Sequence, residues 1–298
     1  MSVKTHLLFL LIFCTFFAQA QDDLLSMFDE EETTNYATAS FKATRVVLGQ
    51  SVENPKNGNL NFMIQHQFGS MAKGGYELWG LDQANIRLGF EYGITDWLGI
   101  AIGRASYNKT FDGTVKVKIL RQSSGKRKMP ITLSYFGGTY YNSLKWENPD
   151  QTNYETSRFS FCNQLLIARK FNDRLTLQIA PTLIHRNLVA TKEEEHDVIS
   201  IAPSGRFKLT QRFSLNAEYF YLMPGYTADH FEPAFNVGFD IETGGHVFQV
   251  YLTNAMGIQE PYFIAQSTEQ WGKGQIHLAF NLYRTFVIKK PKTHKIED

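Results

Sequence analysis

The last strand-like segment of the chain, from Gly274 to Ile288, restricts the fold more than any other stretch. Its alternate positions are mainly apolar, namely Ile276, Leu278, Phe280, Leu282 and Phe286. The positions between them are polar or small, namely Gln275, His277, Ala279, Asn281 and Thr285. Because successive side chains of a strand point to opposite faces, this segment has one apolar and one polar face. It is also long enough to cross a bilayer at a tilt, which takes about 9–11 residues.

Most of eleven earlier segments show the same alternation. They lie approximately at 60–68, 84–92, 97–108, 114–122, 130–141, 157–171, 174–185, 197–210, 212–222, 233–242 and 245–254. An even number of strands, here about twelve, is usual in single-chain bacterial membrane barrels. No stretch shows a helical period of any length. The pattern predicts an all-β fold, a transmembrane antiparallel up-and-down β-barrel of about twelve strands over residues 60–288.

The connections between these segments alternate in length. Short turns lie at 95–96, 172–173, 210–211 and 243–245, with a slightly longer one at 122–128. Longer polar loops lie near 69–83, 142–156, 186–196, 223–232 and 255–273, whereas the loop near 109–113 is short. Outer-membrane barrels have short periplasmic turns and longer external loops. We therefore expect the long loops outside and both chain ends in the periplasm.

The polar face indicates which side of the wall is outside. A solvated face is normally rich in Lys and Glu, but here Ser, Thr, Asn, Gln, Gly and Ala prevail, which suits a crowded lumen. Aromatic residues near strand ends predict two interfacial girdles. They are Tyr92, Trp97, Tyr140, Tyr141, Trp146, Phe171, Tyr221, Trp271 and Phe286. A secreted soluble β-protein is the alternative fold.

Residues 1–20 predict export. They combine Lys4, an apolar run at 7–17 and the small-residue site Ala18-Gln19-Ala20, which together form a signal peptide. We expect cleavage after Ala20 and insertion into the outer membrane of a Gram-negative cell. Cleavage would leave 278 of the 298 residues, with 29 basic and 29 acidic side chains. The absence of a basic excess argues against a nucleic-acid partner.

Residue types that could support chemistry are few. After residue 20 the only cysteine is Cys162, so an internal disulfide cannot form. The loop cluster Glu193-Glu194-Glu195-His196-Asp197 could hold a hard cation such as calcium, but a charged run in a loop is usually solvated. His185 near Asn187 is a weak basis for a hydrolase. The sequence therefore predicts no catalytic residue, no metal ligand, no cofactor and no enzyme.

Several stretches resemble a bacterial outer-membrane β-barrel family catalogued as domain of unknown function number 5777. They are FKATRVVLGQSVE at 41–53, GLDQANIRLGFEYGITDWLGIAIGR at 80–104, KTFDGTVKVKILRQ at 109–122, IARKF at 167–171, PTLIHRNLV at 181–189, TGGHVFQVYLTNAMG at 243–257 and WGKGQIHLAFNLYRTF at 271–286. The resemblance covers nearly all of the chain after the signal. It implies an outer-membrane barrel with no assigned activity, and it supplies no catalytic residues.

Charged residues of both signs fall on the inward set of the predicted strands. The candidates for lining the lumen are Arg87, Glu91, Lys170, Arg206, Lys208, Glu218 and Asp240. Buried charges are costly without partners, so these must pair across the lumen or meet water. Residues 21–59 are predicted to be a periplasmic lead-in or a partial lumen plug, and residues 289–298 a periplasmic tail. Within 41–52, Arg45 and Gln50 are the plug candidates; a strand, a plug or neither remains open.

Two classes of function follow. The first is a narrow or gated channel, or transport protein, for a small polar solute. The second is a closed barrel with a structural role or a periplasmic or outer-membrane protein partner. An outer-membrane hydrolase comes third. In each case the outer-membrane lipid is a partner of the barrel wall.

Overall fold

The computed structural model of the chain describes residues 33–244 and 246–289. The predicted signal peptide, residues 21–32 of the predicted lead-in and residues 290–298 of the predicted tail lie outside this part. Two compact units are present within it. One small unit holds a two-stranded antiparallel sheet of β1 (Thr34–Tyr36) and β6 (Ser123–Gly125). The other unit contains the barrel.

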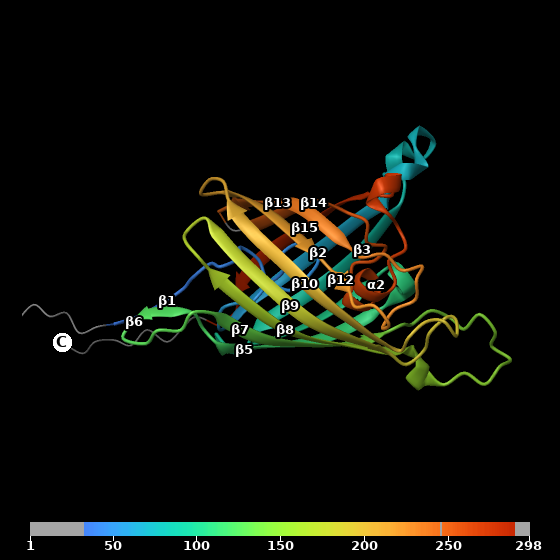
Figure 1. Ribbon diagram of the computed structural model, residues 1–298, viewed down its shortest axis with the longest axis horizontal. Coiled ribbons are helices and arrows are strands. Elements are labelled where there is room, and N and C mark those ends of the chain that lie inside the picture. The colour runs from blue at the N-terminus through green and yellow to red at the C-terminus, as the bar shows by residue number, and fades with distance from the viewer. Residues whose placement is uncertain (1–32, 245, 290–298) are drawn as a thin grey trace, which may run out of the picture. The chain divides into compact units, whose positions relative to one another are not determined.

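Twelve antiparallel strands form the closed barrel, as the sequence predicts (Figure 1). They are β2 (Asn59–Ser70), β3 (Ala84–Gly93), β4 (Leu98–Ala105), β5 (Phe111–Leu120), β7 (Thr132–Tyr141), β8 (Phe159–Lys170), β9 (Leu175–Arg186), β10 (Asp197–Lys208), β11 (Phe213–Tyr219), β13 (Phe235–Thr243), β14 (His246–Thr253) and β15 (His277–Val287). A short strand, β12 (Tyr221–Leu222), continues β11 and also pairs with β10.

The last strand closes the barrel against the first. β15 pairs with β2 from His277 opposite Ser70 to Val287 opposite Asn59, with an irregularity between His277 and Ala279. Closure removes both free edges of the sheet, which in a bilayer would leave backbone groups without hydrogen bonds. The fold prediction is confirmed by this ladder.

The two faces of the wall differ in the way that the alternation predicts. On β9, Leu177 is 46% exposed and Ile179 is 43% exposed, whereas Gln178 between them is 5% exposed. The apolar residues therefore point outwards and the polar and small residues point into the lumen. A soluble barrel has the opposite arrangement, because its apolar side chains must leave water.

Within residues 33–244 and 246–289, one α-helix and five 3₁₀-helices lie in the connections. The 3₁₀-helices are η1 (Met71–Lys73), η2 (Gly75–Gly80), η3 (Tyr107–Lys109), η4 (Glu155–Arg158) and η5 (Trp271–Lys273). The α-helix, α2 (Glu260–Ala265), lies in the connection between β14 and β15, and all six of its residues are buried. The sequence predicts a longer polar loop near 255–273, and the structure places a short helix of buried, mainly apolar residues within it.

In the described part of the chain, no helix has both the length and the apolar character needed to cross a membrane.

Candidate functional site: the filled lumen

A segment without regular strands, from Ala37 to Asn57, fills the middle of the barrel. Its centre is a tight loop in which the N–H of Val46 donates to the carbonyl of Gly49 at 2.8 Å. The N–H of Ser51 donates to the carbonyl of Thr44 at 3.0 Å and closes the loop at its base. Val46 is 1% exposed and Leu48 is fully buried. We call residues 41–52 the inserted loop.

The tip of the inserted loop is held by a carboxylate on β11. The Oε1 atom of Glu218 accepts the backbone N–H groups of Leu48 at 2.7 Å and Gly49 at 2.9 Å. It also accepts the side-chain amide of Asn236 at 2.8 Å. Hydrogen bonds to a charged group are stronger than those between neutral groups. Glu218 therefore fixes the loop at its most deeply inserted point.

A lysine on β5 holds the base of the same loop. The Nζ atom of Lys116 donates to the carbonyl oxygens of Thr44 at 2.8 Å, Ser51 at 2.9 Å and Glu53 at 3.1 Å. Amides of other strands bind the loop backbone as well. Gln249 donates to the carbonyl of Val46, Asn281 to that of Val47 and Gln178 to that of Gln50. The polar side chains of the wall thus donate hydrogen bonds to the backbone carbonyl groups of a loop that makes few hydrogen bonds within itself.

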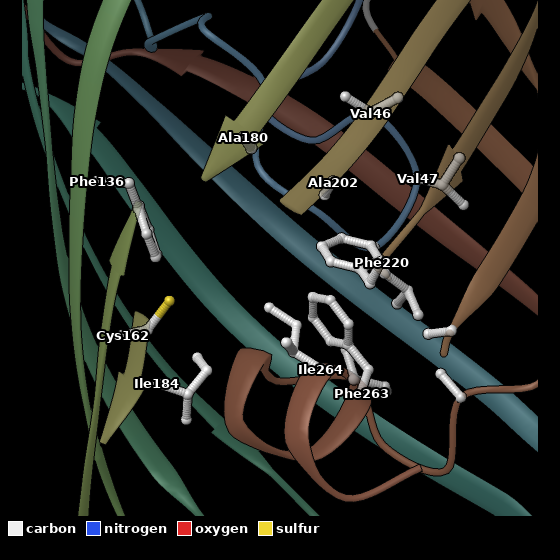
Figure 2. Close-up of a cluster of buried hydrophobic side chains, with 14 of the residues drawn as sticks. Val46, Val47, Phe136, Cys162, Ala180, Ile184, Ala202, Phe220, Phe263 and Ile264 are labelled. Carbon is white, nitrogen blue, oxygen red and sulfur yellow. The ribbon is translucent and has the colours of Figure 1, made fainter. Parts of the chain in front are cut away.

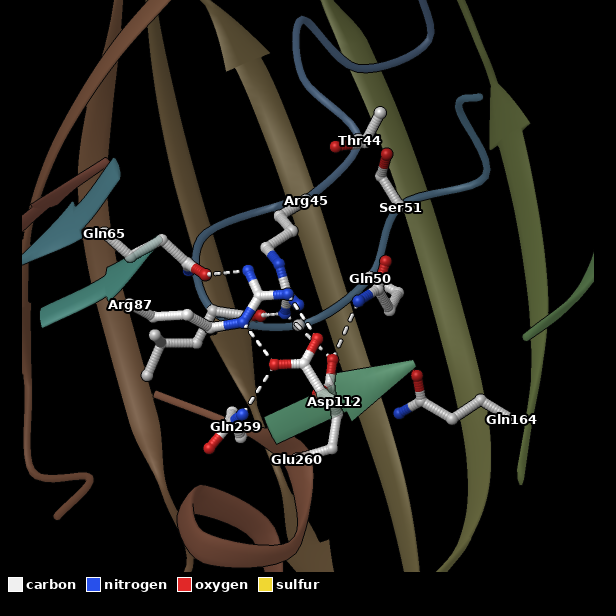
Figure 3. Close-up of polar contacts among 12 residues, drawn as sticks. Thr44, Arg45, Gln50, Ser51, Gln65, Arg87, Asp112, Gln164, Gln259 and Glu260 are labelled. Atoms are coloured by element: carbon white, nitrogen blue, oxygen red, sulfur yellow. Dashed lines mark hydrogen bonds and ion pairs between the residues drawn. The ribbon is translucent and has the colours of Figure 1, made fainter. Parts of the chain in front are cut away.

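The inserted loop meets α2 at a buried ion pair (Figure 3). Nη1 of Arg45 lies 2.8 Å from Oε1 of Glu260, the first residue of α2, and both side chains are almost completely buried. Gln50 donates to the same oxygen at 2.7 Å, and the hydroxyl of Tyr140 donates to Oε2 at 2.6 Å. Two segments separated by more than 200 residues in the sequence are therefore joined in the lumen.

The two charges of this pair stabilise each other. Burial opposes ionisation of Glu260, but the Arg45 charge and the hydrogen bonds from Tyr140 and Gln50 outweigh it and hold the pKa of that carboxyl below its usual value. Burial likewise opposes protonation of Arg45, yet the charge of Glu260 raises the pKa of the guanidinium. Removing one member of such a pair typically costs about 3–5 kcal/mol, because the other charge stays buried alone.

A second ion pair fixes the residue before α2 to the wall. Arg87 on β3 makes two hydrogen bonds to Asp112 on β5, Nε to Oδ2 at 2.8 Å and Nη2 to Oδ1 at 2.5 Å. Gln65 accepts a third bond from Arg87 at 3.0 Å. Gln259 donates to Oδ2 of Asp112 at 2.6 Å. The start of α2 is thus attached both to the inserted loop and to the barrel.

Apolar side chains bury the rest of α2 (Figure 2). Phe263 packs edge-on against Phe220, with ring centroids 5.0 Å apart. Ile264 belongs to the same cluster as Ile184 and Cys162, which point inwards from β9 and β8. A six-residue helix is too short to be stable alone. Packing against this apolar part of the lumen wall is what stabilises α2.

The predicted lumen residues occupy different positions in this arrangement. Arg87, Glu91, Arg206, Glu218 and Asp240 are buried. Glu91 accepts the hydroxyl of Thr44 at 2.6 Å, and Arg206 donates to the carbonyl of Ala39 at 2.9 Å. Asp240 accepts the amide of Gln249 at 2.8 Å.

The two lysines predicted to line the lumen are less buried than these five residues. Lys170 contacts the carbonyl of Thr38 at 3.3 Å and pairs with Asp173 in the adjacent turn at 3.1 Å. Lys208 is partly exposed.

Of the residues predicted to line or plug the lumen, Arg45 and Gln50 are the two that bind Glu260. Tyr140 also binds Glu260 and is 2% exposed, so its prediction as a residue of an interfacial girdle is wrong: its side chain lies inside the lumen.

Several residues of the site were not predicted from the sequence. Lys116 alternates with Val115 and Val117, so the inward pattern was present, but Asp112 fell in a stretch assigned to a loop. Glu260 has no strand pattern at all. The run Tyr262-Phe263-Ile264 after Pro261, in a loop predicted to be polar, is the signal that could have revealed α2.

The charged loop cluster forms local pairs. Glu194 binds Arg186 at 2.9 Å, and His185 lies 2.7 Å from Asp197. Within residues 33–244 and 246–289, no group of three or more His, Cys, Asp or Glu side chains is arranged to hold a metal ion.

Two small cavities flank the inserted loop, and Gln50 lines both. One has about 250 Å³ of empty space, including space open to solvent, and lies between the loop base and strands β3 to β7. The other has about 210 Å³ of empty space, also including space open to solvent, and lies beside the loop tip.

One family model agrees with the architecture. The model of a family described as membrane bound beta barrel domain (DUF5777) matches residues 41–286. No curated protein matches the chain significantly. One similar solved structure is a KdgM porin. Its sequence identity is 9% and the TM-score is 0.47, and the match covers 76% of this chain and 99% of the porin chain.

Two further solved structures are similar at the same level. A NanC porin is 10% identical with a TM-score of 0.47, covering 78% of this chain and 100% of that one. An outer membrane channel from Pseudomonas putida F1 is 12% identical with a TM-score of 0.44, and the match covers 79% of this chain and 98% of that one. The family resemblance seen in the sequence is confirmed by the matched residues. The chain belongs to the membrane bound beta barrel domain family.

Proposed function

We propose that the protein is an outer-membrane channel for a small polar solute, which is closed at rest and opens when the inserted loop and α2 leave the lumen. The observation that carries this proposal is the meeting of two separate chain segments at Arg45 and Glu260. The segments belong to connections at opposite ends of the barrel, because residue 58 precedes the first strand and α2 follows β14. Each can leave without breaking a wall strand.

The wall behind the inserted loop supports a channel over a permanently closed barrel. A barrel that only needs to be closed can fill its interior with large inward side chains. Here many inward residues of β7 to β11 are small, including Ser134, Ala168, Ala180, Thr182, Ser200, Ala202 and Ser214. Removing residues 41–52 would therefore leave space along this part of the wall, and that space would be lined by Gln178, Glu218 and other polar groups.

The test is single-channel recording in planar bilayers with the intact mature protein and with a variant lacking residues 21–52. We expect little or no basal conductance from the intact protein, a rise after the deletion, and a further rise when Phe263→Ser and Ile264→Ser also release α2 from the wall. A matched control is Lys73→Ala, which removes an exposed ion pair with Glu77 in the loop after β2 and leaves the lumen unchanged. Its conductance should equal that of the intact protein.

Two outcomes would contradict the proposal. A large, steady conductance in the intact protein would show that the inserted segments do not close the lumen. A deletion variant that folds as a barrel and still conducts nothing would favour the second function, a closed barrel with a structural or partner-binding role. Folding of the variant is checked by the heat-dependent shift of barrels in gel electrophoresis.

A further inference from the structure

The cavity beside the loop tip is lined mainly by oxygen-bearing side chains. Its lining residues are Gly49, Gln50, Gln164, Gln178, Ala180, Ala202, Ser204, Glu218 and Phe220. No imidazole or thiol is among them, so the ligands that favour zinc or copper are missing from this lining. Carboxylate, amide and hydroxyl oxygens are instead the ligands of hard cations. The cavity itself is small, with about 210 Å³ of empty space including space open to solvent.

Glu218 brings a carboxyl group to this cavity without a basic partner. Its side chain is 2% exposed. Within the described residues, no Lys, Arg or His forms an ion pair with it; the buried pairs are Arg45 with Glu260, Arg87 with Asp112 and Arg186 with Glu194. Oε1 accepts the hydrogen bonds of the loop tip, and Oε2 faces Gly49, where a Cβ atom would lie only 2.9 Å away. Ionising a carboxyl group in such a buried place is costly unless an opposite charge compensates it.

Gln164 on β8 provides an independent observation. The residue is 2% exposed, and its Nε2 donates to the hydroxyl of Thr182 at 2.9 Å. Its Oε1 is buried and has no hydrogen-bond partner in the structure. Gln164 projects into the lumen from the wall beside Gln50 (Figure 3). A buried carbonyl oxygen without a donor is normally satisfied by water or by a cation.

We propose that this cavity binds one small monovalent cation, of the sodium or potassium class, with Glu218 and Gln164 as ligands. One uncompensated carboxylate matches one positive charge. Calcium usually collects six to eight oxygens, among them several carboxylates, and the cavity offers a single one. Because Gly49 and Gln50 form one side of the cavity, the site is complete only while the inserted loop occupies the lumen. Cation binding therefore stabilises the inserted state, whether or not the barrel conducts.

The test is thermal unfolding of the full mature protein in detergent micelles, in NaCl, KCl or N-methyl-D-glucamine chloride at equal ionic strength. At a sodium or potassium concentration ten times the dissociation constant, we expect the unfolding temperature to be about 3–5 °C above that in the bulky organic cation. Glu218→Gln and Gln164→Leu should each abolish this difference. Broadening of the ²³Na NMR line by the intact protein, and not by Gln164→Leu, reports binding directly.

Asp240→Asn is the matched control, since it removes one carboxylate charge from the same lumen outside the cavity. It should keep the full cation response. Equal unfolding temperatures of the intact protein in all three salts would overturn the proposal, and so would a response that persists in Gln164→Leu or disappears in Asp240→Asn. Gln164→Leu removes the candidate ligand without changing any charge, so it decides the question even if Glu218→Gln fails to fold.

Discussion

At the residue scale, one glycine permits the inserted loop to lie where it does. A Cβ atom at Gly49 would lie 2.7 Å from Cζ of Phe220 and 2.9 Å from Oε2 of Glu218. Gly49→Ala should therefore push the loop tip away from Glu218, at a cost of about 1–3 kcal/mol for overpacking. We expect trypsin to cleave after the buried Arg45 at least about fivefold faster, because proteolysis follows the population of the open form.

The control for this prediction is Gly113→Ala on β5, where a Cβ would meet nothing within 4 Å. Its cleavage rate should equal that of the unmodified protein. An unchanged rate in Gly49→Ala would contradict the close approach of Gly49 to Phe220 and Glu218.

The ion pair between Arg45 and Glu260 provides a second residue-scale prediction. Arg45→Met and Glu260→Gln should each lower the free energy of unfolding by about 3–5 kcal/mol, since each leaves a buried group without its partner. The double variant should lose less free energy of unfolding than the sum of the losses of the two single variants. Urea unfolding of all four proteins measures this difference as a coupling energy. Additive losses would mean that the two side chains do not interact energetically.

This ion pair also predicts a pH dependence. The folded-state pKa of Glu260 is lowered from its ordinary value of 4.5. The stabilisation is therefore complete above about pH 4.5 and is lost as the pH falls through the lower folded-state pKa. Unfolding measured from pH 6 to pH 2 should show this loss in the unmodified protein and a smaller loss in Glu260→Gln.

At the element scale, α2 depends on the wall that it covers. Cys162 is fully buried in the apolar cluster that contains Phe263 and Ile264, and it is the only cysteine after residue 20. The accessibility of its thiol therefore reports whether α2 covers this part of the wall. Replacing both Phe263 and Ile264 by Ser should release α2 and make the thiol accessible, so that a water-soluble maleimide labels the folded variant but not the unmodified protein.

Leu188→Ser is the control for the labelling of Cys162, since Leu188 is 56% exposed in a loop. It should leave the thiol protected. Rapid labelling of the unmodified protein would show that α2 does not cover the wall on the timescale of the reaction.

At the scale of the whole molecule, the alternating connection lengths predict the orientation in the membrane. Single cysteines in a Cys162→Ser background at positions 73, 146, 194, 229 and 266 should react with a membrane-impermeant reagent on whole cells. Cysteines at 96, 173 and 244 should not react, because short turns face the periplasm. Glu194 is buried in its ion pair with Arg186 and Gln266 is partly buried, so both positions should react more slowly than the exposed position 73. Labelling at 173 without labelling at 73 would reverse the orientation.

The sequence by itself determined the barrel. Alternation in segments such as 175–186 is a local property, because strand geometry alone sends successive side chains to opposite faces. The inward positions of Arg87, Glu218 and Asp240 followed from the same rule. The family resemblance followed from motifs spread over residues 41–286.

Only the tertiary structure decided what fills the lumen. Residues 41–52 have no regular period, and their backbone groups are satisfied by Lys116 and Glu218, which lie far away in the sequence. Likewise, α2 is too short to be predicted from its sequence, and it is stable only because it packs against side chains of β8 and β9 and against Phe220. Arg45 and Glu260 are more than 200 residues apart, and no local rule pairs them. Local geometry fixes the strands, whereas the contents of the barrel depend on which buried charges find partners across its interior.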